Sequence, residues 1–126
     1  MKVFIADDSN IVRARLLMTL GDIKGIEIVG QAQDGYSALQ KIRTLKPDVV
    51  ILDIQMPGVD GIQVLKQIKQ HQPDTTVIML TNYPYLVVKI KCLSAGADHF
   101  FDKSTEVDAL YKVIQKLAKG GQVTNE

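Results

Sequence analysis

The chain has 126 residues, enough for one domain, and its 46% apolar and 23% charged residues exclude a disordered or fibrous protein. Its net charge of +1, from 15 basic and 14 acidic residues, argues against nucleic acid as a direct partner, because phosphate-backbone binding usually needs a basic excess. One cysteine, Cys92, excludes an internal disulfide and favours a reducing compartment.

The first predicted element is a strand, since Val3–Ala6 is a short apolar run rich in strand-forming residues. Ser9 can cap a helix that follows and runs to about Leu20, where Gly21 stops it. The next run, Ile26–Gly30, carries a charge and therefore suits an edge strand.

A second helix is predicted over roughly 37–45, with Pro47 just beyond its end. The third strand, Val49–Leu52, is continuously apolar, which is typical of a strand covered on both faces. After Gly61, Ile62, Leu65 and Ile68 have the spacing of a third helix.

The fourth strand, Val77–Leu80, is again continuously apolar. Pro84 suits the first turn of a fourth helix that ends near Gly96. We expect the core stripe of this helix to consist of Leu86, Ile90 and Leu93. Three apolar residues then remain as a surplus that is explained equally well by a partner contact or by loose core packing, namely Tyr85, Val87 and Val88.

The last pair of elements is a short strand over 98–101 and a helix whose apolar stripe runs from Val107 to Ala118. Thr105 and Asp108 resemble a capping box at the start of this helix. We therefore expect one domain over residues 1–119 and a flexible C-terminal tail over residues 120–126.

Strand and helix alternate five times, which indicates an α/β fold with a parallel sheet and right-handed crossovers. The three most apolar strands should be central. This predicts a single-domain flavodoxin-like (βα)5 fold with strand order 2-1-3-4-5 and helices on both faces.

Polar residues follow four of the strands: Asp7 and Asp8 the first, Asp53 the third, Thr81 the fourth, Asp102 and Lys103 the fifth. In this fold they share the carboxyl edge of the sheet, where ligands bind. Strands one and four both adjoin strand three, so Asp7, Asp8 and Thr81 should each lie about 5 Å from Asp53. The long side chain of Lys103 can cross most of the remaining gap.

Three carboxylates at close quarters repel one another and should either raise the pKa of one of them or recruit a cation. Oxygen ligands suit a hard ion such as Mg²⁺. Asp53 could then act as a carboxylate nucleophile toward a phosphoryl group, with Lys103 and Thr81 holding its oxygens. Singly, each of these residues is more simply a helix cap, a turn former or a surface charge, but capping does not explain the joint pattern.

The residues Asp7-Asp8-Ser9, the stretch 52–61 with its Asp-x-x-Met-Pro-x-x-Asp-Gly core, the Leu80-Thr81 step, residues 96–98 and Lys103 resemble the response-regulator receiver domain, the CheY-like family of two-component signalling. The resemblance covers nearly the whole chain and implies that Asp53 accepts a phosphoryl group from the phosphohistidine of a sensor histidine kinase or phosphotransfer protein.

The resemblance also implies roles for the neighbouring residues. Asp8, Asp53 and the backbone carbonyl of Gln55 would ligate Mg²⁺, with Asp7 acting mostly through water. Thr81 and Phe100 would be the switch residues. Their motion would reshape a surface of the fourth helix, fifth strand and fifth helix, to which a downstream protein target binds.

The sequence departs from the common family pattern at three positions. Asn82 replaces a small residue and could narrow access to the site, and Ser104 replaces a proline whose peptide bond is often cis. Phe100 replaces the commoner tyrosine, so one hydrogen bond is lost from its inward state, and simple core packing explains it equally well.

Two other classes of protein share parts of this pattern. A haloacid-dehalogenase phosphatase would carry Asp-x-Asp after the first strand, and a flavodoxin-like cofactor binder would need a phosphate loop where Asp7 and Asp8 would repel the phosphate. We therefore expect no enzyme beyond Mg²⁺-dependent self-phosphorylation and self-dephosphorylation at Asp53.

No segment approaches the roughly 20 apolar residues of a membrane span, so we expect a cytoplasmic protein without membrane insertion. We also expect no direct binding of this chain to nucleic acid. A receiver that stands alone is the leading interpretation, and Gly120-Gly121 could instead begin a linker to a further domain.

Overall fold

The computed structural model describes residues 1–120 as five parallel strands and five helices in strict alternation. The strands are β1 (Lys2–Ala6), β2 (Glu27–Ala32), β3 (Val49–Asp53), β4 (Thr76–Thr81) and β5 (His99–Asp102). The helices are α1 (Asn10–Leu20), α2 (Gly35–Leu45), α3 (Gly61–His71), α4 (Leu86–Ser94) and α5 (Val107–Ala118). None of the helices in this part of the chain is long and apolar enough to cross a membrane.

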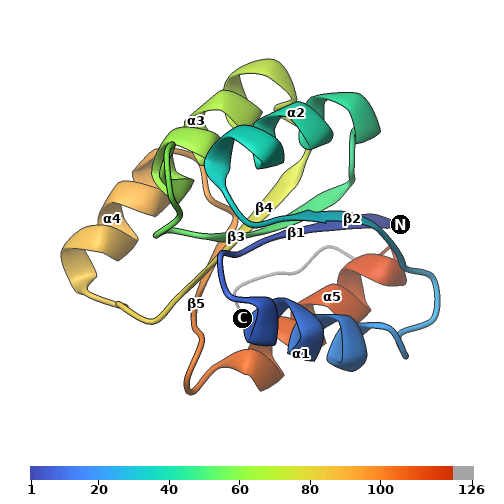
Figure 1. The fold of residues 1–126 in the computed structure, drawn as a ribbon. Helices are drawn as coiled ribbons and strands as arrows, with labels where there is room; N and C mark the ends of the chain where they lie inside the picture. The colour runs from blue at the N-terminus through green and yellow to red at the C-terminus, as the bar shows by residue number, and fades with distance from the viewer. Residues whose placement is uncertain (121–126) are drawn as a thin grey trace.

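The strand order is β2-β1-β3-β4-β5, which confirms the predicted flavodoxin-like arrangement with the two weakest strands at the edges. Helices α2, α3 and α4 cover one face of the sheet, and α1 and α5 cover the other (Figure 1). Successive side chains of a strand point to opposite faces, so a strand buried on both must be apolar throughout. In β3, Val50 and Leu52 face α2 and α3, whereas Val49 and Ile51 face α1 and α5.

Three of the predicted helix starts were wrong. Helix α2 begins at Gly35, two residues early, because Asp34 caps it by accepting the backbone N–H of Ser37 at 2.8 Å. Helix α4 begins at Leu86, so Pro84 precedes it and does not lie in its first turn. The predicted capping box of α5 is absent, because Glu106 occupies the N-cap position and its side chain makes no capping bond.

The predicted core stripe of α4 was also wrong. Leu86, Ile90 and Leu93 are exposed, whereas Cys92 is fully buried and Val88 packs against the core on the α3 side of the sheet. Cys92 is thus a small buried hydrophobic residue, and burial raises the pKa of its thiol to about 11. Of the predicted tail, residues 121–126 lie outside the described residues.

Candidate functional site

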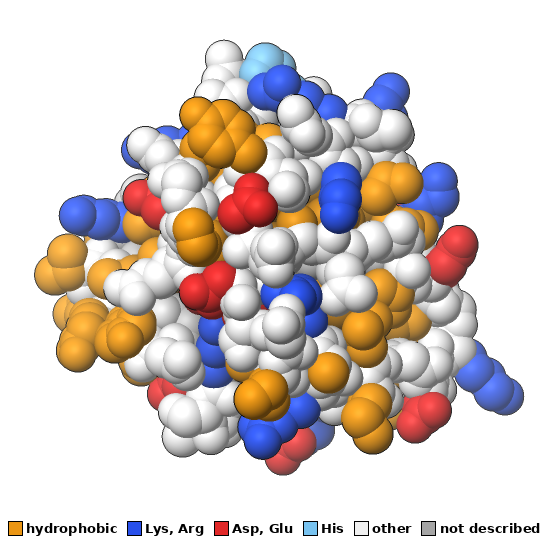
Figure 2. Space-filling model, in the orientation of Figure 1, with side chains coloured by type: hydrophobic (Ala, Val, Ile, Leu, Met, Phe, Trp, Pro, Cys, Tyr) orange, Lys and Arg blue, Asp and Glu red, His pale blue; other side chains and the backbone are white. Residues whose placement is uncertain are grey.

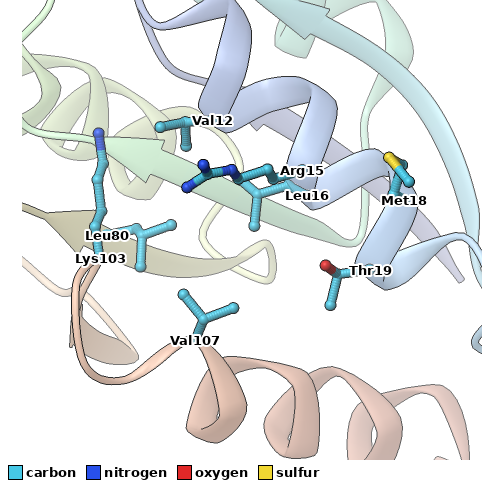
Figure 3. A pocket seen from close by; sticks show the side chains of 8 residues that line it. All are labelled: Val12, Arg15, Leu16, Met18, Thr19, Leu80, Lys103 and Val107. Carbon is cyan, nitrogen blue, oxygen red and sulfur yellow. The ribbon is translucent and has the colours of Figure 1, made fainter.

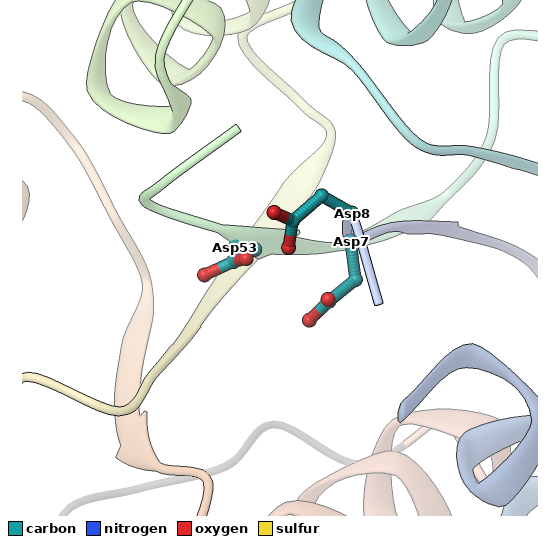
Figure 4. Close-up of side chains that lie close together, drawn as sticks. All are labelled: Asp7, Asp8 and Asp53. Carbon is teal, nitrogen blue, oxygen red and sulfur yellow. The ribbon is translucent and has the colours of Figure 1, made fainter. Parts of the chain in front are cut away.

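The ends of β1 and β3 bring three carboxylates together at the carboxyl edge of the sheet. Oxygen atoms of Asp7, Asp8 and Asp53 lie within 4.8 Å of one another. Figure 4 shows Asp8 turned toward Asp53, with Asp7 beside them at the end of β1. Asp7 and Asp53 are only 1% and 5% exposed, whereas Asp8 is open to solvent. The predicted grouping of acids is therefore present.

Lys103 supplies the positive charge of the site. Its Nζ lies 2.5 Å from Asp7 Oδ2 and 3.2 Å from Asp53 Oδ2, so the lysine spans from the end of β5 to both β1 and β3. Its backbone N–H donates to the carbonyl of Thr81 at 2.8 Å, which fixes the start of its loop to the end of β4. The nearer partner of Lys103 is thus Asp7, and the predicted reach of the lysine toward Asp53 is also present.

An apolar pocket between α1 and α5 holds the stem of Lys103. The pocket has a volume of about 280 Å³, and its walls include Leu16, Leu80 and Val107. In Figure 3 the lysine stem runs along this pocket with its ammonium group at the far end. Lys103 thus packs its methylene groups along apolar side chains, while its ammonium group is paired with Asp7 and Asp53.

Electrostatics at Asp53 follow from this arrangement. Burial, then the negative charge of Asp7, raises the pKa of Asp53 to about 6, although Lys103 acts in the opposite direction. One ammonium group does not offset three carboxylates. The site retains excess negative charge, and its donors are all oxygen atoms, which fits a small hard dication such as Mg²⁺.

Thr81 and Phe100, the two predicted switch residues, lie on β4 and β5. Leu80 is the residue opposite Asp53 in the register of the sheet, and Thr81 follows it at the end of β4. Thr81 Oγ1 accepts the backbone N–H of Tyr83 at 3.0 Å. Phe100 is half-buried, lies opposite Met79 and packs against the core on the α3 side. Thr81 therefore ends the strand next to that of Asp53, whereas Phe100 lies one strand further away, on β5.

The loop after β3 contains the remaining predicted ligand, Gln55, which is exposed two residues beyond Asp53. Gly61 keeps this loop close to the strand. A Cβ atom at position 61 would lie 2.0 Å from the backbone oxygen of Asp53, and the Gly61 N–H donates to the carbonyl of Ile54 at 2.7 Å. Only glycine allows such an approach. The peptide bond before Ser104 is trans, as is every described peptide bond.

Arg13 is a supporting residue that the sequence analysis missed. Its Nη1 donates to the backbone carbonyl of Asp7 at 2.5 Å, and its Nε donates to the side chain of Gln31 at 3.1 Å. The arginine thereby ties the acidic loop to β2. The only sequence signal was a basic residue one helical turn after the cap of α1, which also describes many surface residues.

Comparison with known proteins gives consistent matches. The family model described as the response regulator receiver domain matches residues 3–115. The Bacillus subtilis protein described as an uncharacterized transcriptional regulatory protein, YhcZ, is 43% identical over 115 residues, which are 91% of this chain and 54% of the relative. The response regulator GacA of Pseudomonas aeruginosa is 32% identical over 95% of this chain and 56% of its own.

A solved structure of similar fold is the isolated REC domain of RcsB from Salmonella enterica serovar Typhimurium, in the presence of phosphomimetic BeF3-. Its TM-score is 0.89 at 31% identity, over 100% of this chain and 94% of that one. The chain spans about half the length of the curated relatives that it matches.

Proposed function

Because this chain belongs to the family of response regulator receiver domains, we propose that Asp53 accepts a phosphoryl group from the phosphohistidine of a sensor histidine kinase or phosphotransfer protein. The observation that carries the proposal is the meeting of three carboxylates within 4.8 Å, with the ammonium group of Lys103 on two of them. A capping role alone would not bring these groups together.

The donor set supports a Mg²⁺ site. Asp8, Asp53 and the backbone carbonyl of Gln55 would hold the ion directly, and Asp7 would act mostly through water. When bound, the dication neutralises the excess charge of the acids and attracts phosphoryl oxygens. Lys103 and Asp7 are already paired, so Asp7 is better placed to orient the lysine than to bind the ion directly.

In the transfer, a carboxylate oxygen of Asp53 attacks phosphorus, and the bond from phosphorus to the imidazole nitrogen of the donor breaks with its electron pair on that nitrogen. The product is an acyl phosphate on Asp53. The Lys103 ammonium group and the Thr81 hydroxyl group would then hold phosphoryl oxygens. Later attack of water on phosphorus returns the carboxylate and releases inorganic phosphate. The chain would thus react only with itself and its donor.

The hydrogen bond at Thr81 supports a role in switching. Thr81 Oγ1 accepts from the backbone of Tyr83, just before α4. A threonine that turns to donate to a phosphoryl oxygen would change this bond and so disturb the loop that leads into α4. Phe100 on β5 would follow and reshape the surface of α4, β5 and α5 to which a downstream protein binds.

We further propose that the domain comprises residues 1–119, works in the cytoplasm and does not itself bind nucleic acid. The net charge of +1 supports the last point. One solved relative is an RcsB–DNA complex, of which this chain covers 64%. In proteins of that kind, DNA would be contacted by the portion that this chain does not match.

The test is incubation of the purified protein with Mg²⁺ and acetyl phosphate, followed by mass spectrometry of the modified peptide. A mass increment of one phosphoryl group should appear on Asp53 and be absent from Asp53→Asn and from samples with excess chelator. Asp74→Asn, which changes an exposed turn residue, is the matched control. Sustained hydrolysis without labelled protein would instead indicate a phosphatase, and no reaction at all would contradict the proposal.

A further inference from the structure

The first turn of α2 is in contact with the loop that joins β3 to α3, residues 54–60. Gly35, the first residue of α2, is buried, and its backbone N–H donates to the carbonyl of Pro57 at 3.4 Å. The ring of the next residue, Tyr36, lies beside Gly58, where a Cβ atom would be 3.5 Å from it. Figure 1 shows the beginning of α2 next to this loop. Two successive residues of α2 therefore touch the loop.

The contact at Gly35 leaves no room for a side chain. A Cβ atom at this position would lie 2.0 Å from the backbone oxygen of Val59 and 2.7 Å from its Cβ, whereas real Cβ atoms essentially never approach another heavy atom within 3.0 Å. The φ of Gly35 is not positive, so backbone conformation does not require a glycine here. The close approach of the loop does.

The loop, and not the helix, would yield to an added side chain. Helix α2 is fixed by the core, since Ala38 and Ile42 are fully buried, and by the cap at Asp34. Residues 54–60 belong to no strand or helix, and four of these seven residues are exposed. A Cβ atom at position 35 would therefore displace the loop by about 1 Å, the difference between 2.0 and 3.0 Å.

The proposed Mg²⁺ ligand of this loop, the backbone carbonyl of Gln55, lies between two points of attachment. One is the contact with α2, and the other is the Gly61 N–H, which donates to the carbonyl of Ile54 at 2.7 Å. Mg²⁺ requires nearly octahedral ligands at about 2.0–2.1 Å, whereas Ca²⁺ accepts variable geometry at about 2.3–2.6 Å. A displaced loop would therefore weaken the binding of Mg²⁺ more than that of Ca²⁺.

We propose that Gly35 is a positioning residue for the metal site. The absence of a side chain at this residue lets the start of α2, Gly35 and Tyr36, hold the loop where the Gln55 carbonyl meets a small ion. Helix α2 supplies no ligand and acts only through the loop, yet it sets the preference of the site for Mg²⁺ over Ca²⁺. The inference rests on the proposed function for the identity of the ion and of the Gln55 ligand.

The test compares Gly35→Ala with the wild type by isothermal titration calorimetry of the full chain with Mg²⁺ and, separately, with Ca²⁺. We expect Mg²⁺ binding to weaken by about 10- to 100-fold, the usual loss when the support of a metal ligand is removed. Ca²⁺ binding should weaken by less than about threefold, because its coordination is more adaptable. Equal losses for the two ions, or none for either, would overturn the proposal.

Gly30→Ala is the matched control for a methyl group in a tight space. Its Cβ would meet the side chains of Leu45 and Phe4 at 3.0 and 3.1 Å, on β2 and away from the loop. This substitution should lower the free energy of unfolding without changing the ratio of the two dissociation constants. The same change of ratio in Gly30→Ala would show that general destabilisation is responsible, and would overturn the role of Gly35.

A second variant serves if Gly35→Ala does not fold, as judged by circular dichroism. Tyr36 is 67% exposed, so Tyr36→Ala removes the contact with Gly58 and leaves the core intact. We expect a smaller change of the Mg²⁺ to Ca²⁺ ratio in the same direction. Hydrogen exchange of the Gly61 amide, whose bond to Ile54 closes the loop, should become faster. An unchanged ratio with unchanged exchange would overturn the proposal.

The same samples are labelled with acetyl phosphate. A wild type that binds Mg²⁺ and is labelled on Asp53, with an unchanged ion preference in the variants, overturns the positioning role alone. The expected change of preference in protein that cannot be labelled overturns the phosphoacceptor proposal alone. A wild type that neither binds Mg²⁺ nor is labelled overturns both. The failures are therefore distinguishable.

Discussion

Asp53 is a buried carboxylate next to a second buried carboxylate, Asp7, and its ionisation is unfavourable for both reasons. Together they raise the pKa of Asp53 to about 6, despite the opposing effect of Lys103. In the unfolded chain the same group has an ordinary pKa near 4. The folded protein therefore binds a proton at Asp53 more tightly than the unfolded chain does.

The sign of the pH dependence follows. The stability that comes from protonated Asp53 is fully present below about pH 4 and is lost as the pH rises through about 6. Without metal, Asp53→Asn should therefore exceed the wild type in free energy of unfolding by about 1–3 kcal/mol at pH 7.5. This excess should disappear near pH 4. Urea denaturation in chelator across this range measures it, and an excess that is independent of pH would contradict the raised pKa.

Lys103 is the only side chain that an ion pair joins to both Asp7 and Asp53 in residues 1–120. Loss of one preorganised charge of this kind typically slows a transfer reaction by about 100-fold or more. We expect Lys103→Met to reduce the rate of Asp53 labelling by acetyl phosphate to that extent. Lys112→Met is the control, since that residue is exposed on α5. Labelling at an undiminished rate would show that the ammonium group has no part in the transfer.

At the scale of elements, the sequence predicted the strands and their order because a continuous apolar run is typical of a parallel strand covered on both faces. The three strands of this kind therefore belong at the centre of the sheet and the two weaker strands at its edges. The edges of the helices were less predictable. Asp34 and Glu106 both precede helices, and only the folded backbone decides that Asp34 bonds Ser37 whereas Glu106 makes no capping bond. A cap depends on the direction in which the chain enters a helix, and sequence spacing does not fix that direction.

The stripe of α4 was predicted wrongly for a related reason. Leu86, Ile90 and Leu93 have helical spacing, but so do Val88, Cys92 and Ala95, which are the residues that face the core. When both sides of a helix are apolar, periodicity cannot tell which one is buried. Figure 2 shows hydrophobic side chains gathered at the edge of the molecule where Figure 1 places α4. The larger side chains, those of Leu86, Ile90 and Leu93, face solvent here, which is the opposite of the usual preference.

The cap of α2 allows a direct test at this scale. Asp34 accepts the backbone N–H of Ser37 at 2.8 Å and its hydroxyl group at 3.1 Å. Asp34→Ala should lower the free energy of unfolding by about 1 kcal/mol, the usual contribution of an N-cap. Asp74→Ala, in an exposed turn, should change it by less than about 0.5 kcal/mol. Equal effects of the two substitutions in urea denaturation would show that the cap contributes nothing specific.

At the scale of the whole molecule, the carboxyl-edge rule for parallel sheets was sufficient to predict that Asp7, Asp8, Asp53 and Lys103 meet. Sequence could not show the pairing of Lys103 with Asp7 or the bond from Arg13 to the Asp7 carbonyl. Both depend on side-chain directions at the ends of different elements. The rule places residues at an edge, and packing decides which atoms touch.

That placement also links the acid cluster to global stability. Asp8 and Asp53 meet only when β1 and β3 are paired, so a dication that needs both carboxylates binds the folded chain and not the unfolded one. At 100 times its dissociation constant, such an ion stabilises a protein by about 2.7 kcal/mol. Mg²⁺ at this excess should therefore raise the melting temperature of the wild type by about 10 °C, since 1 kcal/mol shifts the melting temperature of a domain of this size by about 4 °C.

The variants divide into two groups in this measurement. Asp8→Asn and Asp53→Asn each remove an oxygen charge from the site and should lose most of the Mg²⁺-induced shift, while Asp74→Asn should retain it. An equivalent ionic strength of NaCl is the control for general screening. If Mg²⁺ stabilises all four proteins equally, or none of them, the three carboxylates do not form a metal site, and the phosphoryl transfer proposed for Asp53 would have to proceed without one.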